Sequence, residues 1–324
     1  MTHLLEVKDV RVYYYTARGP VKAVEGVSFS LPAGERFGLI GESGSGKSTM
    51  ALSLVRLIKP PGRIESGEVW LDGVDLMTLS DEQMRQLRLA GIALITQGAM
   101  NSLNPVIRIR PQIIDGLGSH GVQISKREAD HRVGELLEWV GLRPEVADMF
   151  PHQLSGGMKQ RVCTAIAISL RPKVIIADEP TSALDVVVQR QVMETLRRVQ
   201  EDLGASVILI GHDMGLMAQF ADRMGVMYAG RLVEEGAVRD IFSKPQHPYS
   251  QLLMASLPSL EKKDVFQGIP GFPPSLLELP PGCVFHPRCP YAMDRCTAEN
   301  PDPKAVAPNH WAACHLIEEH QDGS

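Results

Sequence analysis

The stretch GESGSGKST, residues 41–49, has the residue types of a loop that binds phosphate. It fits the pattern G-x-x-x-x-G-K-[ST], whose glycines let backbone N–H groups converge on phosphate oxygens without a Cβ in the way. An apolar strand pattern precedes it and a helical pattern follows, which argues against a chance glycine-rich turn. Lys47 would reach the β- and γ-phosphates of ATP, and Ser48 would hold Mg²⁺. The predicted nucleotide-binding residues of this phosphate loop are Gly41, Ser43, Gly44, Ser45, Gly46, Lys47, Ser48 and Thr49.

A second chemical signal is the stretch VIIADEP, residues 174–180, an apolar run that ends in two carboxylates. Asp178 suits Mg²⁺ coordination, directly or through water, because carboxylate oxygens are ligands that this ion prefers. Glu179 is placed to polarise an attacking water as a general base. The alternative is an acidic pair that caps the next helix. The phosphate loop earlier in the chain favours the catalytic interpretation.

A third signal is the stretch PHQLSGGMKQR, residues 151–161, where a Ser/Gly turn opens another helix. By the same backbone argument it is a second candidate site for an anion. The simpler interpretation is an N-cap at Ser155 for the following helix. One nucleotide needs only one phosphate cradle, so two such turns in one chain require an explanation.

The elements that must position these residues alternate between strand and helix patterns. Residues 4–15 and 21–31 have the period of two of half-buried strands, and Asp72-Gly73 marks a hairpin. Residues 98–172 have helical patterning, and a later helix is expected to end at Gly204. Residues 174–178 and 206–211 are short, apolar and β-branched, like buried parallel strands. The pattern predicts an α/β core with an N-terminal antiparallel β part and a helical subdomain.

Composition narrows the class of protein. The chain has 324 residues, which suggests about two domains, and its net charge of −5 gives no basic excess for nucleic acid. We see no apolar run near the ~18 residues that span a bilayer, and no secretory signal at the start. A cytosolic protein is therefore expected, in which clustered cysteines more often indicate metal binding or catalysis than disulfides.

Taken in order, GESGSGKST, LSGGM at 154–158 and VIIADE at 174–179 resemble an ATPase subunit of an ABC transporter. The resemblance implies that two such chains pair head to tail, with each ATP clamped between one chain's phosphate loop and the other's LSGG turn. It explains the second Ser/Gly turn. The residues that would contact the partner or its ATP are Ser155, Gly156, Gly157 and, in the segment SALD at 182–185, Asp185.

The resemblance assigns three more positions. Gln97, after the apolar run GIALIT, matches the glutamine that contacts Mg²⁺ and the attacking water, and His212 matches the histidine that contacts the γ-phosphate. An aromatic residue near the first strand usually stacks on adenine in this family. The register of the strand favours Tyr14 over Tyr13 and Tyr15, although each of them could instead pack in the sheet.

A closer resemblance is to the ATPases of dipeptide and oligopeptide importers, and it covers nearly the whole chain. It rests on NSLNP (101–105), LSGGMKQR, HPYSQLLMASLP (247–258) and IPGFPPSL (269–276). It implies an ABC nucleotide-binding domain over 1–240, with the helical subdomain at about 98–172, and a small irregular C-terminal domain over 241–324. This chain departs from the group at Gly98, usually aspartate, and at Gly211, usually threonine. Gly98 is expected to loosen the loop that reports nucleotide state to the membrane subunits.

The cysteine tail, residues 282–314, collects four of the chain's five cysteines, Cys283, Cys289, Cys296 and Cys314. No close C-x₂₋₄-C pair occurs among them, which disfavours zinc and suits a larger cluster. The resemblance implies a [4Fe–4S] cluster, because the importer ATPases carry a comparable tail. Zinc and four unpaired thiols stay open, as does a mixed site with His286, His310 or His315. We expect the cluster to staple a separate tail, whose loss leaves nucleotide binding intact. The fifth cysteine, Cys163, is expected in the apolar core.

The function that these resemblances imply is that of an ATP-hydrolysing motor of a membrane importer for peptides. The implied partners are a second, similar ATPase subunit, two transmembrane permease subunits and an extracytoplasmic solute-binding protein, with no nucleic acid. The chain would then lie on the cytoplasmic face of the inner membrane. The alternatives are a motor that imports nickel or oligosaccharides, a non-transport ABC ATPase, and a redox- or iron-sensing regulator that uses the cysteine tail.

Overall fold

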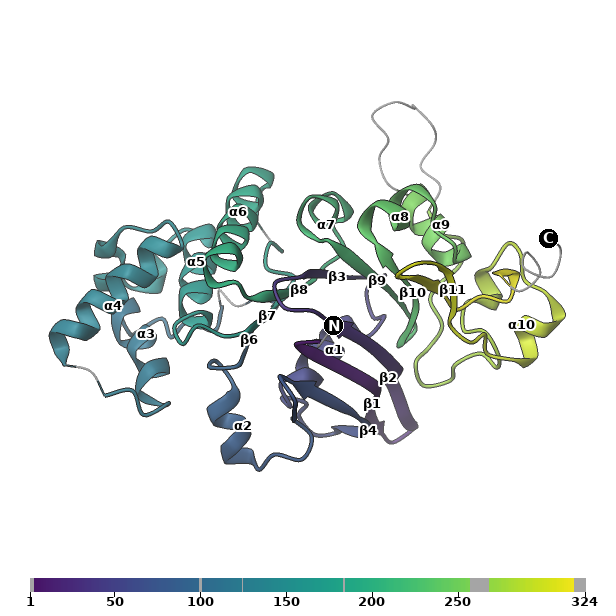
Figure 1. Ribbon diagram of the computed structural model, residues 1–324, viewed down its shortest axis with the longest axis horizontal. Helices are drawn as coiled ribbons and strands as arrows, with labels where there is room; N and C mark the ends of the chain where they lie inside the picture. The colour runs from purple at the N-terminus through teal and green to yellow at the C-terminus, as the bar shows by residue number, and fades with distance from the viewer. Residues whose placement is uncertain (1–2, 99–100, 124, 183, 257–267, 318–324) are drawn as a thin grey trace. The chain divides into compact units, whose positions relative to one another are not determined.

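The computed structural model describes residues 3–98, 101–123, 125–182, 184–256 and 268–317, which divide into two compact units (Figure 1). Unit 1 contains Leu31–Arg36 and Trp70–Ile210, together with the residues up to Leu5. Unit 2 contains Glu6–Ser30, Phe37–Val69 and the residues from Gly211 onward. The domain boundaries expected from the sequence, 1–240 and 241–324, stay a prediction.

Unit 1 is built on three parallel strands in the order β6-β7-β8. Every residue of β7 and β8 is buried, as expected for parallel strands that are covered on both faces. The apolar runs at 174–178 and 206–211 therefore formed the predicted strands. The strands of this unit are β5 (Val74–Asp75), β6 (Ile92–Ile95), β7 (Val174–Asp178) and β8 (Ser206–Ile210).

The helices of unit 1 begin and end at residues with a local physical reason. The side chain of Ser125 accepts the backbone N–H of Glu128 at the start of α4, and α6 ends at Gly204 with a φ of 63°, as predicted. Three of these helices lie within residues 98–172, where helices were expected. The helices are α2 (Asp81–Leu87), α3 (Ile109–Gly118), α4 (Lys126–Trp139), α5 (Gly156–Ala167) and α6 (Val186–Leu203), with 3₁₀ turns η2 (Pro144–Asp148) and η3 (Pro151–Gln153).

Unit 2 begins with a sheet in which β1 (Leu5–Thr16) lies between β2 (Gly19–Leu31) and β4 (Gly62–Leu71). The two-residue connection between β1 and β2 makes this pair an antiparallel hairpin, as expected. Asp72 and Gly73 form the predicted turn between β4 and β5, with φ angles of 50° and 80°.

A second sheet of unit 2 has the order β11-β12-β10-β9-β3. Strands β3 and β9 are parallel, and the remaining neighbours are antiparallel. Strands β11 and β12 were not predicted, because strands of three or four residues are too short to show a period of two. The elements of this part are β3 (Arg36–Ile40), α1 (Lys47–Leu54), α7 (Met214–Phe220), β9 (Arg223–Tyr228), β10 (Arg231–Ala237), α8 (Val238–Ser243), α9 (Pro248–Ala255), η4 (His286–Arg288), α10 (Asp294–Ala298), β11 (Lys304–Ala307) and β12 (His310–Ala312).

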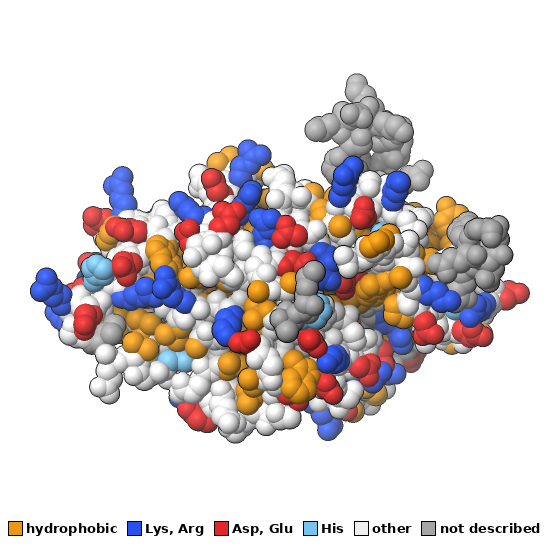
Figure 2. Space-filling model, viewed as in Figure 1, with side chains coloured by type: hydrophobic (Ala, Val, Ile, Leu, Met, Phe, Trp, Pro, Cys, Tyr) orange, Lys and Arg blue, Asp and Glu red, His pale blue; other side chains and the backbone are white. Residues whose placement is uncertain are grey.

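The surface charge and the length and apolar character of the helices relate to the environment that was expected for the protein. On the face shown in Figure 2, basic and acidic side chains are interspersed, in keeping with a net charge of −5. Within the described part of the chain, no helix combines the length and the apolar character needed to cross a bilayer.

Candidate functional site

The phosphate loop connects β3 to α1 in unit 2, and its glycines are required by the backbone. Gly41 has a φ of 150° and Gly46 a φ of 101°. A Cβ on Gly41 would lie 2.1 Å from the carbonyl oxygen of Met227, and a Cβ on Gly46 would lie 2.1 Å from that of Ala23. Both distances are far below any real contact, so only glycine fits at these two positions. The loop is thus a backbone cradle whose exposed edge contains Ser43 and Gly44.

Lys47 is held inside this cradle and is only 6% exposed. Its ammonium donates to the carbonyl oxygens of Gly41 (2.8 Å) and Glu42 (2.9 Å) and to Ser45 Oγ (3.3 Å). No side-chain hydrogen bond caps α1 at Gly46. A buried cation at the start of a helix, whose N-terminal end is the positive end of the helix dipole, suits an anion of phosphate chemistry.

The predicted catalytic carboxylate lies at the end of β7 in unit 1. Glu179 has a φ of 46°, which is rare for a residue with a side chain and costs on the order of 1–3 kcal/mol. Its carboxylate oxygen Oε2 accepts a hydrogen bond from Nε2 of Gln97 at 2.9 Å. The structure therefore brings together two residues that are 82 positions apart and that the sequence assigned to the same water. Asp178 precedes Glu179 and is 4% exposed, at the carboxyl end of the buried strand.

The remaining predicted ATP contacts lie in unit 2. His212 is exposed and directly precedes Asp213, which is the N-cap of α7. Tyr14 lies on the same face of β1 as the buried Val10 and Val12, and its ring packs against Gly62. This packing is the alternative that the sequence left open, and the stacking of Tyr14 on adenine stays a prediction. The joint action of these residues with Gln97, Asp178 and Glu179 also stays a prediction.

The predicted partner-facing turn opens α5 in unit 1. Ser155 is exposed and is the N-cap, because its Oγ accepts the N–H of Met158 at 3.3 Å. A Cβ on Gly157 would lie 2.4 Å from Val188 Cγ1, so this glycine lets α5 and α6 approach closely. Asp185 caps α6 through the N–H of Val188 at 3.0 Å.

Beside this turn, the first residues of α6 leave Val186 and Val187 79% and 68% exposed. The turn and α6 thus present exposed backbone and apolar side chains together. Of the segment 182–185, Ala183 lies outside the described residues.

The metal centre predicted for the cysteine tail finds no support among the described residues. Among the described residues, no group of three or more His, Cys, Asp or Glu side chains could hold a metal ion. The predicted [4Fe–4S] site at Cys283, Cys289, Cys296 and Cys314 is therefore not supported. Burial raises the pKa of Cys314 to about 12 and also raises the pKa of Cys283 and Cys289, and the charges of neighbouring cysteines add to each of these shifts. Cys163 is 8% exposed, as predicted for a core residue.

The histidines near the tail have other partners. A ring nitrogen of His286 bonds to the carbonyl oxygen of Cys283 at 2.9 Å. His310 bonds to Glu234 at 2.8 Å, and His315 bonds to the carbonyl oxygen of Glu299 at 3.0 Å. The mixed His/Cys site that the sequence left open is therefore not formed either.

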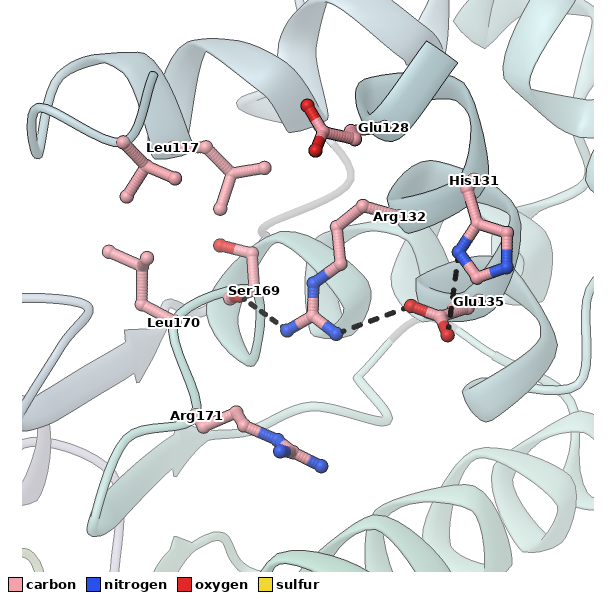
Figure 3. A pocket seen from close by; sticks show the side chains of 9 residues that line it. Leu117, Glu128, His131, Arg132, Glu135, Ser169, Leu170 and Arg171 are labelled. Carbon is pink, nitrogen blue, oxygen red and sulfur yellow. Dashed lines mark hydrogen bonds and ion pairs between the residues drawn. The ribbon is translucent and has the colours of Figure 1, made fainter. Parts of the chain in front are cut away.

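The helical part of unit 1 also contains a cavity. It has a volume of about 480 Å³ and lies between α4 and the segment that follows α5 (Figure 3). Arg132 crosses it, donating to the carbonyl oxygen of Ser169 at 3.0 Å and pairing with Glu135 at 3.5 Å. None of the predicted site residues lines this cavity.

Sequence reasoning missed the contacts of Glu42, the second residue of the phosphate loop. Its backbone N–H donates to the hydroxyl of Tyr249 at 2.8 Å, and its carboxylate pairs with Arg288 at 2.7 Å. Both partners belong to unit 2, and both come from the region after residue 240 that was expected to be a separate appendage. No local pattern signals such contacts, because Arg288 lies 246 positions from Glu42.

Two family models match separate parts of the chain. A family model described as "ABC transporter" matches residues 24–182, and one described as "Oligopeptide/dipeptide transporter, C-terminal region" matches residues 233–296. The chain is 46% identical to the dipeptide transport ATP-binding protein DppD of Haemophilus influenzae, over 92% of this chain and 91% of the relative. It is 44% identical to the oligopeptide transport ATP-binding protein OppD of Bacillus subtilis, over 98% of this chain and 90% of the relative.

A solved structure supports the fold as well. The dimeric post-hydrolysis state of the ATP-binding cassette MJ0796 bound to ADP and Pi is similar with a TM-score of 0.65 and 29% identity. The similarity covers 72% of this chain and 99% of that one. It confirms the predicted α/β fold of an ABC ATPase, with its N-terminal β part and helical region.

Proposed function

The chain belongs to the ATP-binding subunits of dipeptide and oligopeptide ABC transporters, and from this premise we propose that it is the ATP-hydrolysing motor of a peptide importer. The observation that carries the proposal is the cradle of the phosphate loop, where a Cβ on Gly41 or Gly46 would collide with a backbone carbonyl. Such a backbone is built for the phosphates of a nucleotide. The dipeptide and oligopeptide transport proteins named above support peptides as the solute.

Different residues of the chain would bind the phosphates and activate the attacking water. Lys47 and the first N–H groups of α1 would hold the phosphates, replacing the carbonyl contacts that Lys47 now makes. Glu179 would take a proton from the attacking water, and the amide of Gln97 fixes the orientation of its carboxylate. His212 would contact the γ-phosphate.

The donor chemistry also fits Mg²⁺. The oxygens of Ser48, Gln97 and Asp178 are of the type that this ion prefers. Mg²⁺ would neutralise charge on the phosphate oxygens when it is bound.

The proposed assembly contains a second, similar ATPase subunit. The exposed Ser155 at the start of α5 and the exposed apolar start of α6 support a face that meets another chain, with Gly156 and Gly157 beside it. Two permease subunits and an extracytoplasmic solute-binding protein would complete an importer, with this chain on the cytoplasmic face of the inner membrane. These partners follow from family membership and not from a contact in the structure.

The metal content of the cysteine tail is a separate proposal. We propose a [4Fe–4S] cluster there, with Zn²⁺ as the alternative, and the support is the presence of four thiols in one short segment. Two of them are already neighbours, since the N–H of Cys283 donates to the carbonyl oxygen of Cys296 at 2.9 Å. In the part of the chain that the structure describes, these thiols are not yet placed to hold a metal ion, and the residues proposed for hydrolysis do not include them. Iron, sulfide and zinc contents of anaerobically purified protein test the proposal, and protein with none of them would refute it.

The motor function is tested with Glu179→Gln in the transporter reconstituted in vesicles. The variant is expected to bind ATP but to lose hydrolysis by roughly 10²- to 10⁴-fold, the range of a general base. Peptide uptake should fall in parallel. Uptake of nickel or oligosaccharides, with no uptake of peptides, would support one of the alternative solutes. Full hydrolysis by the variant would refute the assignment of Glu179.

A further inference from the structure

Glu42 of the phosphate loop is held at all three of its polar groups. Its N–H donates to the hydroxyl of Tyr249 at 2.8 Å, and its carbonyl oxygen accepts from the ammonium of Lys47 at 2.9 Å. Its two carboxylate oxygens accept from Arg288 at 2.7 and 3.1 Å. A residue in the middle of a glycine-rich loop is thereby fixed in position, although its neighbours Ser43 and Gly44 are exposed.

The guanidinium of Arg288 uses its full donor capacity in this contact. Besides the carboxylate of Glu42, it donates to the hydroxyl of Tyr228 at 3.2 Å and to the carbonyl oxygens of Pro270 (2.8 Å) and Ile269 (3.3 Å). Five N–H groups thus meet five acceptors, and the side chain is only 4% exposed. A lysine could not replace it, because one ammonium cannot reach acceptors on both sides of a planar fork.

A cluster of three buried aromatic rings supports this contact. The rings of Tyr228, Tyr249 and Phe285 form a cluster with centroid distances of 4.5, 5.1 and 5.4 Å. All three side chains are at most 1% exposed. Tyr228 ends β9, Tyr249 lies on α9 and Phe285 lies in the cysteine tail, so the cluster joins the sheet to the C-terminal part of the chain within unit 2.

We propose that Arg288 is a positioning residue for ATP, through which the cysteine tail controls the conformation and the charge of the phosphate loop. The proposal rests on the nucleotide-binding function proposed above. Without Arg288, Glu42 would keep a carboxylate with no partner in the loop that receives the phosphates. The loop would then lose its anchor and present a negative charge to an anionic ligand. The tail is therefore not an independent appendage, and its loss is expected to weaken ATP binding.

The experiment compares Arg288→Gln with the double variant Arg288→Gln/Glu42→Gln in the full-length chain. Arg288→Gln is expected to raise the KM for ATP and the Kd of a fluorescent ATP analogue by roughly 10- to 100-fold, since charged hydrogen bonds are lost. The kcat should change little, because Glu179 is untouched. The double variant should regain most of the affinity, since the uncompensated charge is gone. The matched control is Arg295→Gln, which removes an exposed arginine of the same tail that pairs with Glu299, and it should leave the KM unchanged.

Tyr249→Phe is a second test that leaves Arg288 in place. It removes only the hydroxyl that accepts the N–H of Glu42, and a rise of KM of several-fold is expected. If limited proteolysis shows that Arg288→Gln does not fold, the KM of Tyr249→Phe tests the proposal in its place. An unchanged KM in both variants, or a double variant no better than Arg288→Gln, would overturn the proposal. A wild-type chain that binds no ATP would instead overturn the proposed function itself.

Discussion

His247 makes the stability of the C-terminal part of unit 2 depend on pH. Its ring is 1% exposed, and its Nδ1 accepts the N–H of Tyr249 at 3.0 Å at the start of α9. Burial lowers the pKa of His247 from 6.5 to about 4, although the carboxylate of Glu234 pulls in the opposite direction. The folded chain therefore favours the neutral ring, because protonation would turn Nδ1 of His247 into a donor that faces the N–H of Tyr249.

The sign and the size of the effect follow from these values. Above pH 6.5 the ring is neutral in both the folded and the unfolded chain, so the stability is fully present. Between pH 6.5 and 4, His247 is protonated in the unfolded chain but remains neutral in the folded chain. The free energy of unfolding therefore falls as the pH falls. The loss should reach roughly 2 kcal/mol at pH 5 and about 3 kcal/mol near pH 4, since each tenfold change in proton affinity is worth about 1.4 kcal/mol.

Urea unfolding at pH 7 and pH 5 measures this loss, with the fluorescence of Trp311 as the local signal after Trp70 and Trp139 are replaced by Phe. Trp311 lies in β12, which pairs with β10 next to Glu234. His247→Asn should remove about 2 kcal/mol of the pH dependence, because an asparagine can cap α9 and does not titrate.

The control His131→Asn replaces a histidine whose side chain is 75% exposed and should leave the pH dependence unchanged. If His247→Asn lost as much stability between pH 7 and pH 5 as the parent, the reasoning would be wrong.

Four further substitutions test the site. Gln97→Ala removes the amide 2.9 Å from the carboxylate of Glu179, and kcat should fall by roughly 10-fold in an ATPase assay, with ATP affinity nearly unchanged. Gly46→Ala should abolish ATP binding in a nucleotide titration, since its Cβ would lie 2.1 Å from a carbonyl oxygen; Gly44→Ala, with no atom within 4 Å of its Cβ, should cost only about 1–2 kcal/mol of backbone strain. Gly98→Asp should tighten the coupling of ATP hydrolysis to peptide uptake in reconstituted vesicles, and unchanged coupling would count against a role for Gly98.

Several elements of residues 1–240, the predicted nucleotide-binding domain, could be predicted because their sequence signals are local. The turn at Asp72-Gly73 and the C-cap at Gly204 depend on φ angles that few residues accept, so the residue type reports the conformation directly. The strand at 174–178 was equally clear, because a short, fully apolar run has few other uses.

The C-terminal part was predicted less well. The pairing of β12 with β10, which aligns Ala312 with Glu234, was not predicted. The partner of so short a strand is chosen by burial and by long-range hydrogen bonds, which leave no periodic trace. The cysteine spacing likewise suggested a cluster, which the described residues do not support.

The sequence by itself determined the chemistry of the phosphate loop and of the carboxylate after β7, because glycines, a lysine and an acidic pair at these spacings have one dominant use. Only the tertiary structure decided that Glu42 is anchored by Tyr249 and Arg288. The physical reason is that the two features depend on residues at very different separations along the sequence. A φ angle is set by the residue itself, whereas an ion pair between positions 246 apart exists only after the chain has packed the C-terminal part beneath the phosphate loop.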